Sequence, residues 1–137
     1  MDLGLSMAIL NRDQILQAQD IATETVDVPE WGGAVLVRGL TGQQRDSYEA
    51  SIMRLNGTNA QLNLINARAK LVALSIVDEE GARLFSDEDV QLLARKSAAA
   101  LQRVFDVAQR LSGLSASDLE ELSKNSANGQ RDALSID

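Results

Sequence analysis

The stretch that most constrains the fold runs from Lys96 to Leu114 and reads KSAAALQRVFDVAQRLSGL. At about 100° per residue, its apolar side chains share an arc of about 160°, and the opposite arc is polar. This partition predicts an amphipathic helix with one face that must leave water. Ser97 is placed to cap its N-terminus, unless the helix continues from the segment before it, and Gly113 is placed to end it.

The apolar face of this helix needs a partner, which is either the rest of this chain or another protein. Packing in the chain's own core is the commoner role for such a stripe. A stripe this wide can also pack internally and keep one edge for a second protein. The candidate partner-binding residues on the stripe are Leu101, Val104, Phe105, Ala108 and Leu111.

The single tryptophan of the chain, Trp31, lies in the segment VPEWGG. Valines alternate with polar residues before it and form a run after it, and Pro29 and Gly32 are typical turn residues. We therefore predict a β-hairpin over residues 23–40 with Trp31 at its tip. There the indole either folds back onto its own domain or stands out as an anchor for a partner.

Helical spacing of apolar residues recurs in four further segments of the body. A helix over 42–57 starts with the capping-box pair Thr41 and Gln44 and ends at Asn56-Gly57. The segment 63–77 is apolar over much of its circumference, which favours the buried centre of the fold. Residues 87–97 and 115–125 predict shorter helices. The N-terminal arm also has the pattern of a short helix, with Asn11 as its N-cap.

Together these patterns predict a mainly α fold with a small N-terminal β-hairpin (α+β), built as one compact helical domain of about four to five helices. Only 3% of the residues are aromatic while 45% are hydrophobic, so aliphatic side chains must fill the core, which favours helices over a β-sandwich. The expected boundaries are a flexible arm over 1–22, a single domain over 23–124 with its helices within 42–124, and a disordered tail over 125–137.

Residue types that the chain lacks remove several classes of function. It has no cysteine and no histidine, which excludes thiol- and histidine-based nucleophilic sites and the common zinc sites. Its net charge of −7 disfavours nucleic acids and anionic membrane surfaces as partners. With no apolar run long enough to span a bilayer and no signal-peptide pattern, we expect a cytosolic protein. No catalytic, cofactor-binding or metal-binding residue is predicted.

The acidic clusters at 78–80 and 87–89 have ordinary explanations. Neither fits the ligand register of an EF-hand loop, and a solvated turn followed by a charged helix start accounts for both. A glycosidase carboxylate pair is disfavoured because the chain has too few aromatic residues to hold a sugar. Gly32, Gly33, Gly39 and Gly42 fit neither a dinucleotide fingerprint nor a phosphate loop, so we interpret them as turn residues.

The order of several segments closely resembles the tail assembly chaperones of long-tailed bacteriophages and related prophages. The resemblance covers roughly residues 12 to 126 and is carried by VPEWGG, LTGQQRD, VDEEGARLFSDEDV and RKSAAALQRVFDVAQRLSGLS. None of these segments is a catalytic signature, so the resemblance rests on their number and order.

The resemblance implies a non-enzymatic protein of the host cytoplasm that binds the tape measure protein, keeps it soluble while the tail tube polymerises, and is absent from the mature virion. It also implies the shorter product of a frameshifted gene, so the longer product and the tail tube protein are further expected partners. The stripe would equally suit a homo-oligomer. The competing interpretations are a structural tail component, such as a terminator or connector protein, and a small regulatory helical module.

Overall fold

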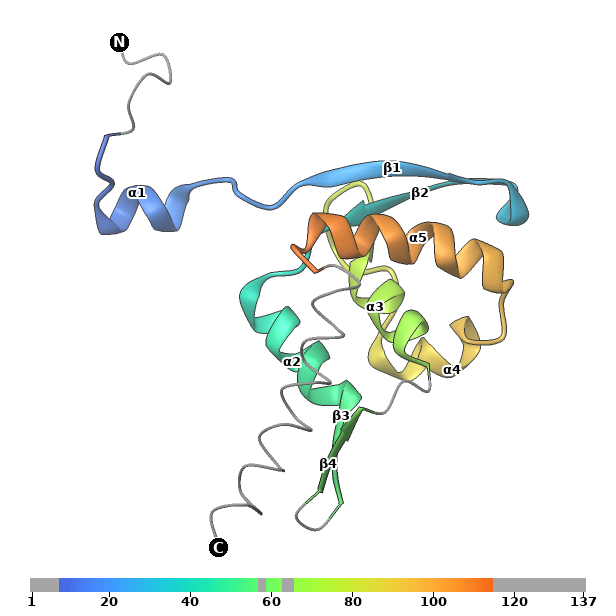
Figure 1. Ribbon diagram of the computed structural model, residues 1–137. Helices are drawn as coiled ribbons and strands as arrows, with labels where there is room; N and C mark the ends of the chain where they lie inside the picture. Colours follow the sequence, from blue (N-terminus) through green and yellow to red (C-terminus); the bar gives the residue numbers. More distant parts are fainter. Residues whose placement is uncertain (1–7, 57–58, 63–65, 115–137) are drawn as a thin grey trace, which may run out of the picture.

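The computed structural model describes residues 8–56, 59–62 and 66–114. An N-terminal arm leads into a β-hairpin that lies along a helical body, and a second small hairpin projects from that body (Figure 1). The elements in chain order are α1 (Arg12–Gln17), β1 (Thr23–Val28), the 3₁₀ turn η1 (Pro29–Trp31), β2 (Gly33–Arg38), α2 (Gly42–Ile52), β3 (Met53–Asn56), β4 (Asn59–Leu62), α3 (Ala67–Ser75), β5 (Ile76–Val77), the 3₁₀ turn η2 (Asp87–Asp89), α4 (Val90–Leu93) and α5 (Ala98–Leu111). The predicted mainly α fold with an N-terminal hairpin is confirmed.

The predicted hairpin forms between β1 and β2, which pair antiparallel from Thr23 opposite Arg38 to Val28 opposite Gly33. Its tip turns through η1 and through Gly32, whose φ of 76° is left-handed and therefore suits glycine. A third strand was not predicted: β5 pairs antiparallel with β2, so the strand order is β1-β2-β5.

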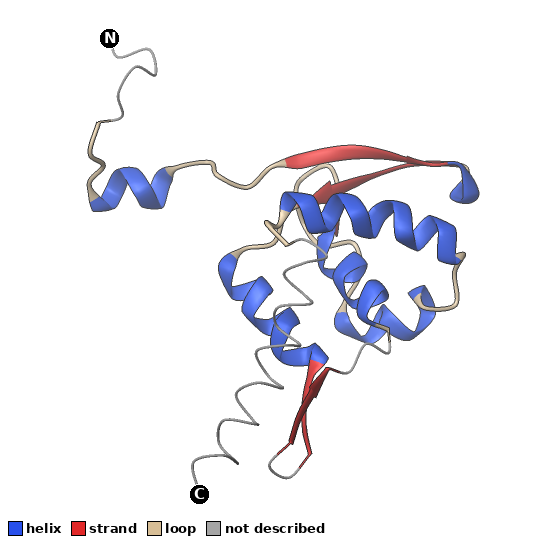
Figure 2. Ribbon diagram, in the orientation of Figure 1, coloured by secondary structure: helices blue, strands red, loops and turns tan. Residues whose placement is uncertain are grey.

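Helix α5 lies between the hairpin and α3 and packs against both (Figure 2). The Ser97 hydroxyl accepts a hydrogen bond from the Ala100 amide at 3.2 Å, and Gly113 follows the helix with a left-handed φ of 71°. Both predicted end signals are therefore confirmed. The helix does not continue from the segment before it, because α4 ends at Leu93 and α5 begins separately at Ala98.

The core gathers around α3, as the apolar circumference of that segment predicted. Six of its nine residues are buried. Tyr48 on α2 packs against α3, and its hydroxyl donates to the Ala67 carbonyl at 3.2 Å. Val28 and Val37 contribute from the sheet and are fully buried. Most side chains in this core are aliphatic. Tyr48 and Phe105 are the aromatic residues buried in it.

Three predicted helices are shorter than expected. The helix predicted over 87–97 consists of the 3₁₀ turn η2 followed by the four-residue α4, which ends at Leu93. The helix predicted over 42–57 ends at Ile52, and residues 53–56 instead form β3, which pairs with β4. Asn56, which we interpreted as part of a helix end, is instead the last residue of β3 and pairs with Asn59. The helix predicted over 63–77 ends at Ser75, because Ile76 and Val77 join the sheet, and residues 63–65 lie outside the described residues.

Two of the glycines interpreted as turn residues have other roles. Gly42 is the first residue of α2. Gly39 permits a close approach, since a Cβ there would lie 2.5 Å from the Leu111 carbonyl oxygen at the end of α5. The helix predicted over 115–125 and the tail predicted over 125–137 lie outside the described residues, as does the start of the arm.

Candidate partner-binding surface

The structure places the predicted α5 stripe in the core of the protein. Leu101 and Phe105 are 6% and 7% exposed, and Val104 and Ala108 are fully buried. Leu111 is partly buried and packs against the same core cluster. In this conformation the stripe meets the sheet and α3 rather than solvent. Partner binding by these five residues stays a prediction, and it would require α5 to separate from the body.

Trp31, the sixth predicted residue, stands apart from the stripe, at the tip of the hairpin. It is partly buried and packs against the core cluster, which is the fold-back that we considered for it. Its indole Nε1 is nevertheless buried without a hydrogen-bond acceptor among the described residues. Leaving a buried donor of this kind unpaired costs about 1–3 kcal/mol, which the apolar contacts of the indole must offset.

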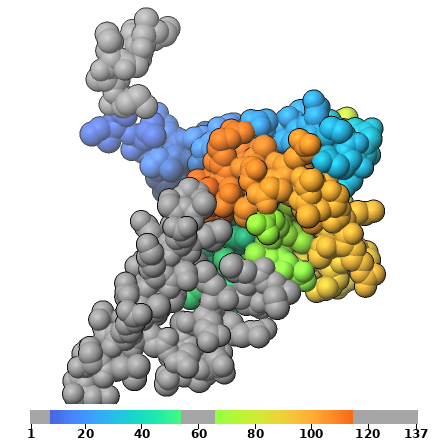
Figure 3. All heavy atoms as spheres, turned by 45° about the vertical axis from the view of Figure 1, so that its right-hand side comes forward, coloured from blue at the N-terminus to red at the C-terminus, as the bar shows by residue number. Residues whose placement is uncertain are grey.

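Trp31 forms one wall of an apolar groove with a volume of about 550 Å³. The opposite wall comes from the loop before η2 and from α4, and these elements lie on the same side of the molecule as the hairpin tip (Figure 3). Leu84 and Leu92 are 55% and 60% exposed there, so large aliphatic surface faces water. We call this feature the Trp31 groove; its lining residues are Glu30, Trp31, Leu84, Phe85, Asp89, Leu92, Leu93 and Lys96.

The hairpin side of the groove is held by an ion pair between Glu30 and α5. Arg103 Nε donates to both carboxylate oxygens of Glu30, at 3.0 and 3.1 Å. A hydrogen bond from the backbone amide of Glu30 itself lowers the pKa of this carboxyl most, and the Arg103 hydrogen bond lowers it further. The carboxylate is therefore ionised at neutral pH, and the ion pair keeps the tip, and Trp31 with it, against α5.

The opposite side of the groove is shaped by a tightly bonded turn. Asp78 Oδ1 accepts hydrogen bonds from the amides of Glu80 and Ala82, at 2.9 and 3.0 Å. The Arg83 guanidinium donates hydrogen bonds to the Ala73 carbonyl and to the Asp87 carboxylate, and these bonds connect the turn to α3 and to η2. The acidic cluster at 78–80 thus forms the solvated turn that we expected. Among the described residues, no group of acidic side chains is arranged to hold a metal ion.

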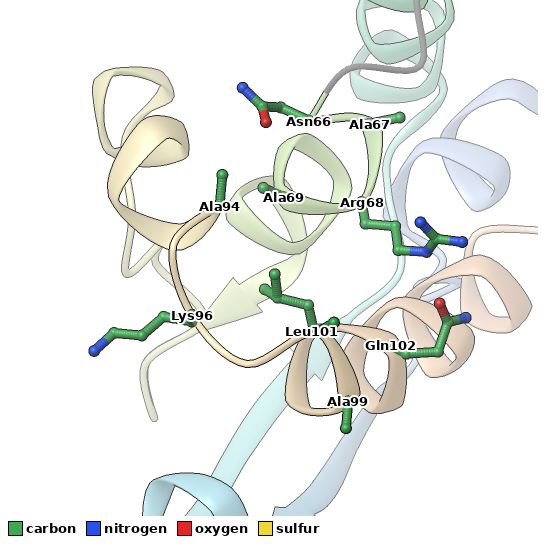
Figure 4. A pocket seen from close by; sticks show the side chains of 10 residues that line it. Asn66, Ala67, Arg68, Ala69, Ala94, Lys96, Ala99, Leu101 and Gln102 are labelled. Atoms are coloured by element: carbon green, nitrogen blue, oxygen red, sulfur yellow. The ribbon is translucent and has the colours of Figure 1, made fainter.

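A second hollow, of about 510 Å³, lies between the start of α3, the end of α4 and the start of α5 (Figure 4). Alanines dominate its lining, so it offers little apolar surface to a partner. Arg68 is committed to the protein itself, because its guanidinium lies 5.8 Å from the centre of the Phe105 ring. Lys96 points away from the hollow (Figure 4). The Trp31 groove is therefore the stronger candidate for binding another protein.

Sequence reasoning identified Trp31 but missed Leu84 and Leu92. Leu92 is next to the buried Leu93 in a helix of four residues, which is too short to show a periodic pattern. Leu84 lies in the loop that follows Gly81, where apolar spacing carries no structural meaning. The sequence offered one chemical indication: Leu84 is an apolar residue between two acidic segments, where a buried environment is not expected from the neighbouring sequence.

Comparisons with known proteins agree on one family. The sequence profile of the phage tail assembly chaperones matches residues 11–125. The fold is similar to that of the tail assembly chaperone of bacteriophage HK97, with a TM-score of 0.52 and 19% identity over 72% of this chain and 94% of that one. No curated protein sequence matches the chain. Within the described ranges, no helix is long and apolar enough to cross a bilayer.

Proposed function

The chain belongs to the phage tail assembly chaperone family, and from this premise we propose that it binds the tape measure protein and keeps it soluble during tail tube assembly. It does so without catalysis, in the host cytoplasm, and is absent from the mature virion. The longer frameshifted product and the tail tube protein are further proposed partners, which the family resemblance alone suggests.

The observation that carries this proposal is the exposure of Leu84 and Leu92 beside Trp31. A long helical client with apolar stretches needs a groove that accepts one face of an amphipathic helix. Tryptophan is among the side chains that contribute most to such interfaces, because it offers large area with little conformational freedom to lose. The Trp31 groove supplies this combination on the surface of the folded protein.

The predicted stripe on α5 is a less accessible site for the same client. Binding at Leu101 or Phe105 would expose the core to water before any contact formed, because both side chains are buried. Binding at the Trp31 groove needs no such opening. We therefore place the first contact with the tape measure protein in the groove.

The charge of the chain suits a protein that must keep an apolar client dispersed. A net charge of −7 disfavours association between complexes, because like charges repel. At the rim of the groove, Asp89 and Lys96 flank the apolar lining and can pair with charges beside the apolar face of the client. Apolar contact then supplies affinity, and the rim supplies orientation.

Co-expression with the tape measure protein of the same phage tests the proposal. The soluble fraction of tape measure protein should rise with the wild-type chain and fall back with Leu92→Asp. Gln91→Asp is the matched control, because it places the same charge on an exposed neighbouring position of α4 and should retain the rescue. Circular dichroism of the purified variants confirms that they are folded.

No rise in soluble tape measure protein with the wild-type chain would contradict the proposed function. Equal loss of rescue by Leu92→Asp and Gln91→Asp would contradict the groove as its site. Finding the chain in stoichiometric amounts in purified virions would instead favour a structural tail component, which is the competing interpretation.

A further inference from the structure

The charged side chains that line the Trp31 groove differ in whether the protein itself already binds them. Two of the three are carboxylates. Glu30 accepts hydrogen bonds from Arg103 Nε with both of its carboxylate oxygens. Asp89 accepts through Oδ2 from the backbone amide and the hydroxyl of Ser86, at 2.9 and 3.2 Å. Both acids are therefore engaged within the chain before any partner arrives.

Lys96 is the third charged residue of the lining, and its ammonium group is free. Lys96 Nζ forms no hydrogen bond or ion pair with the residues that the structure describes. The side chain is exposed, and in Figure 4 its ammonium end points away from the other labelled side chains. Trp31 Nε1 also lacks an acceptor, but it is buried and so is not open to an entering ligand. What the groove offers a partner is therefore a cation with three hydrogen-bond donors.

The free ammonium group lies close to the exposed leucine of the same wall. Helix α4 ends at Leu93, but the chain keeps turning: the Arg95 amide donates to the Leu92 carbonyl at 3.2 Å, and the Lys96 amide donates to the Leu93 carbonyl at 2.9 Å. Leu92 and Lys96 are therefore about one helical turn apart, and both line the groove. The wall combines an apolar contact and a positive charge at a spacing that one helix can match.

We infer that Lys96 makes the Trp31 groove selective for an amphipathic helix that carries an aspartate or glutamate beside its aliphatic face. The aliphatic face packs on Leu84 and Leu92, and the carboxylate lies about one turn from the residue that meets Leu92. There it accepts a charge-assisted hydrogen bond from Lys96 Nζ. That the natural client is a segment of the tape measure protein rests on the proposed function; the charge preference of the groove does not.

The charge of the whole chain alone would favour the opposite client. A net charge of −7 attracts basic segments at long range. Beyond about 8 Å, however, salt screens such attraction at physiological ionic strength. A lysine of the client beside Leu92 would face the free ammonium group at short range, where like charges repel. The contact with Lys96 therefore decides which charge is accepted next to the apolar face.

Two synthetic peptides of identical composition test this preference on the full chain. Each is a helix of about 20 residues with a leucine face and without tryptophan. In the first, glutamates flank the leucine face and lysines lie opposite; in the second, the two are exchanged, so length and net charge stay the same. The emission of Trp31, the single tryptophan, reports binding. The glutamate-flanked peptide should bind about fivefold more tightly, as one exposed ion pair allows.

Variants of the chain assign the preference to Lys96. Lys96→Gln should abolish the difference between the peptides, and Lys96→Glu should reverse it. Arg95→Glu is the matched control, because it changes the same charge on an exposed neighbour that does not line the groove, and it should keep the preference. Leu92→Asp should weaken the binding of both peptides. Equal binding of the two peptides, no binding of either, or an unchanged preference in Lys96→Glu would overturn the inference.

Co-expression with the tape measure protein separates this inference from the proposed function. Lys96→Glu should lower the soluble fraction of tape measure protein, and Arg95→Glu should not. Full rescue by Lys96→Glu, with rescue lost in Leu92→Asp, would overturn the role of Lys96 and leave the proposed function standing. Preference for the glutamate-flanked peptide without any rescue by the wild-type chain would contradict the proposed function and leave the charge preference of the groove standing.

Discussion

Arg103 on α5 and Glu30 at the hairpin tip form an ion pair with a bifurcated hydrogen bond. The guanidinium Nε donates to both carboxylate oxygens, at 3.0 and 3.1 Å. Two turns further along α5, Arg110 binds Glu24 in β1 in the same way, at 2.8 and 3.0 Å. The hairpin is therefore fastened to α5 near both of its ends. Only the Arg103 pair lies beside the Trp31 groove.

Arg103→Gln should loosen the hairpin tip without unfolding the protein. An exposed ion pair contributes at most about 1 kcal/mol, so the loss of unfolding free energy should stay within that value. The fluorescence of Trp31, the single tryptophan, should shift to longer wavelength as the indole becomes more exposed. Arg110→Gln is the control: a similar loss of stability with no change in emission. Identical emission spectra for both variants would show that Arg103 does not position the tip.

Tyr48 should keep its proton in the folded protein at pH values where a free tyrosine loses it. Burial raises the pKa of Tyr48 from 10.0 to about 12. The folded state thus binds the proton more tightly than the unfolded state, so this stability is full below pH 10 and is lost as pH rises from 10 to 12. The total loss is about 3 kcal/mol. Because Tyr48 is the single tyrosine, phenolate absorbance measures it directly. Titration near pH 10 without unfolding would contradict the burial of this side chain.

Much of the fold could be predicted because periodicity and end signals agreed. For α5, the stripe, Ser97 and Gly113 all gave the same bounds. For residues 53–62 the signals conflicted, since Leu55 fits a helical spacing from Ile52 and also the alternation of a strand. Pairing with β4 decided between them, and that contact is not visible in a local pattern. The bounds of α3 failed for a related reason, because Ile76 extends its apolar run although it belongs to the sheet.

The candidate site could be predicted only in part. Trp31 was recognisable because an aromatic residue on a glycine-flanked tip is chemically unusual. Leu84 and Leu92 line the same groove as Trp31 because α4 packs against α3 while the hairpin tip packs against α5. Such long-range placement depends on tertiary contacts, so no local spacing could report it. The stripe illustrates a different ambiguity, since a regular apolar face predicts burial equally well whether a core or a partner provides it.

Ser75→Ala should stabilise the protein. The Ser75 side chain is fully buried, and its hydroxyl has no hydrogen-bond partner among the described residues. Removing a buried unsatisfied hydroxyl should raise the unfolding free energy by about 1 kcal/mol, measured by urea denaturation. Ser51→Ala is the control, because its hydroxyl donates to the Tyr48 carbonyl at 2.7 Å from an exposed position. Equal effects of both substitutions would mean that helix propensity alone accounts for the gain.

Gly39→Ala should destabilise the fold through a steric clash. The added Cβ would lie 2.5 Å from the Leu111 carbonyl oxygen, and backbone must move to relieve it. This movement also strains the hydrogen bond from the Leu40 amide to the Ser112 hydroxyl, now 3.0 Å. We expect a loss of about 1–3 kcal/mol in denaturant titrations. Gly42→Ala, where the Cβ meets open space, should be neutral or slightly stabilising. A neutral Gly39→Ala would refute this close approach.

Phe105→Asp and Leu92→Asp should separate core from surface, since both introduce the same charge in place of a large apolar side chain. Phe105 is 7% exposed, so its replacement buries an unpaired carboxylate and should unfold the protein, as seen by circular dichroism. Leu92 is 60% exposed, so its replacement should change stability by less than about 0.5 kcal/mol and still abolish rescue of the tape measure protein. A folded Phe105→Asp chain that loses rescue would instead place the client on the α5 stripe, because only a side chain that leaves the core during binding could show that behaviour.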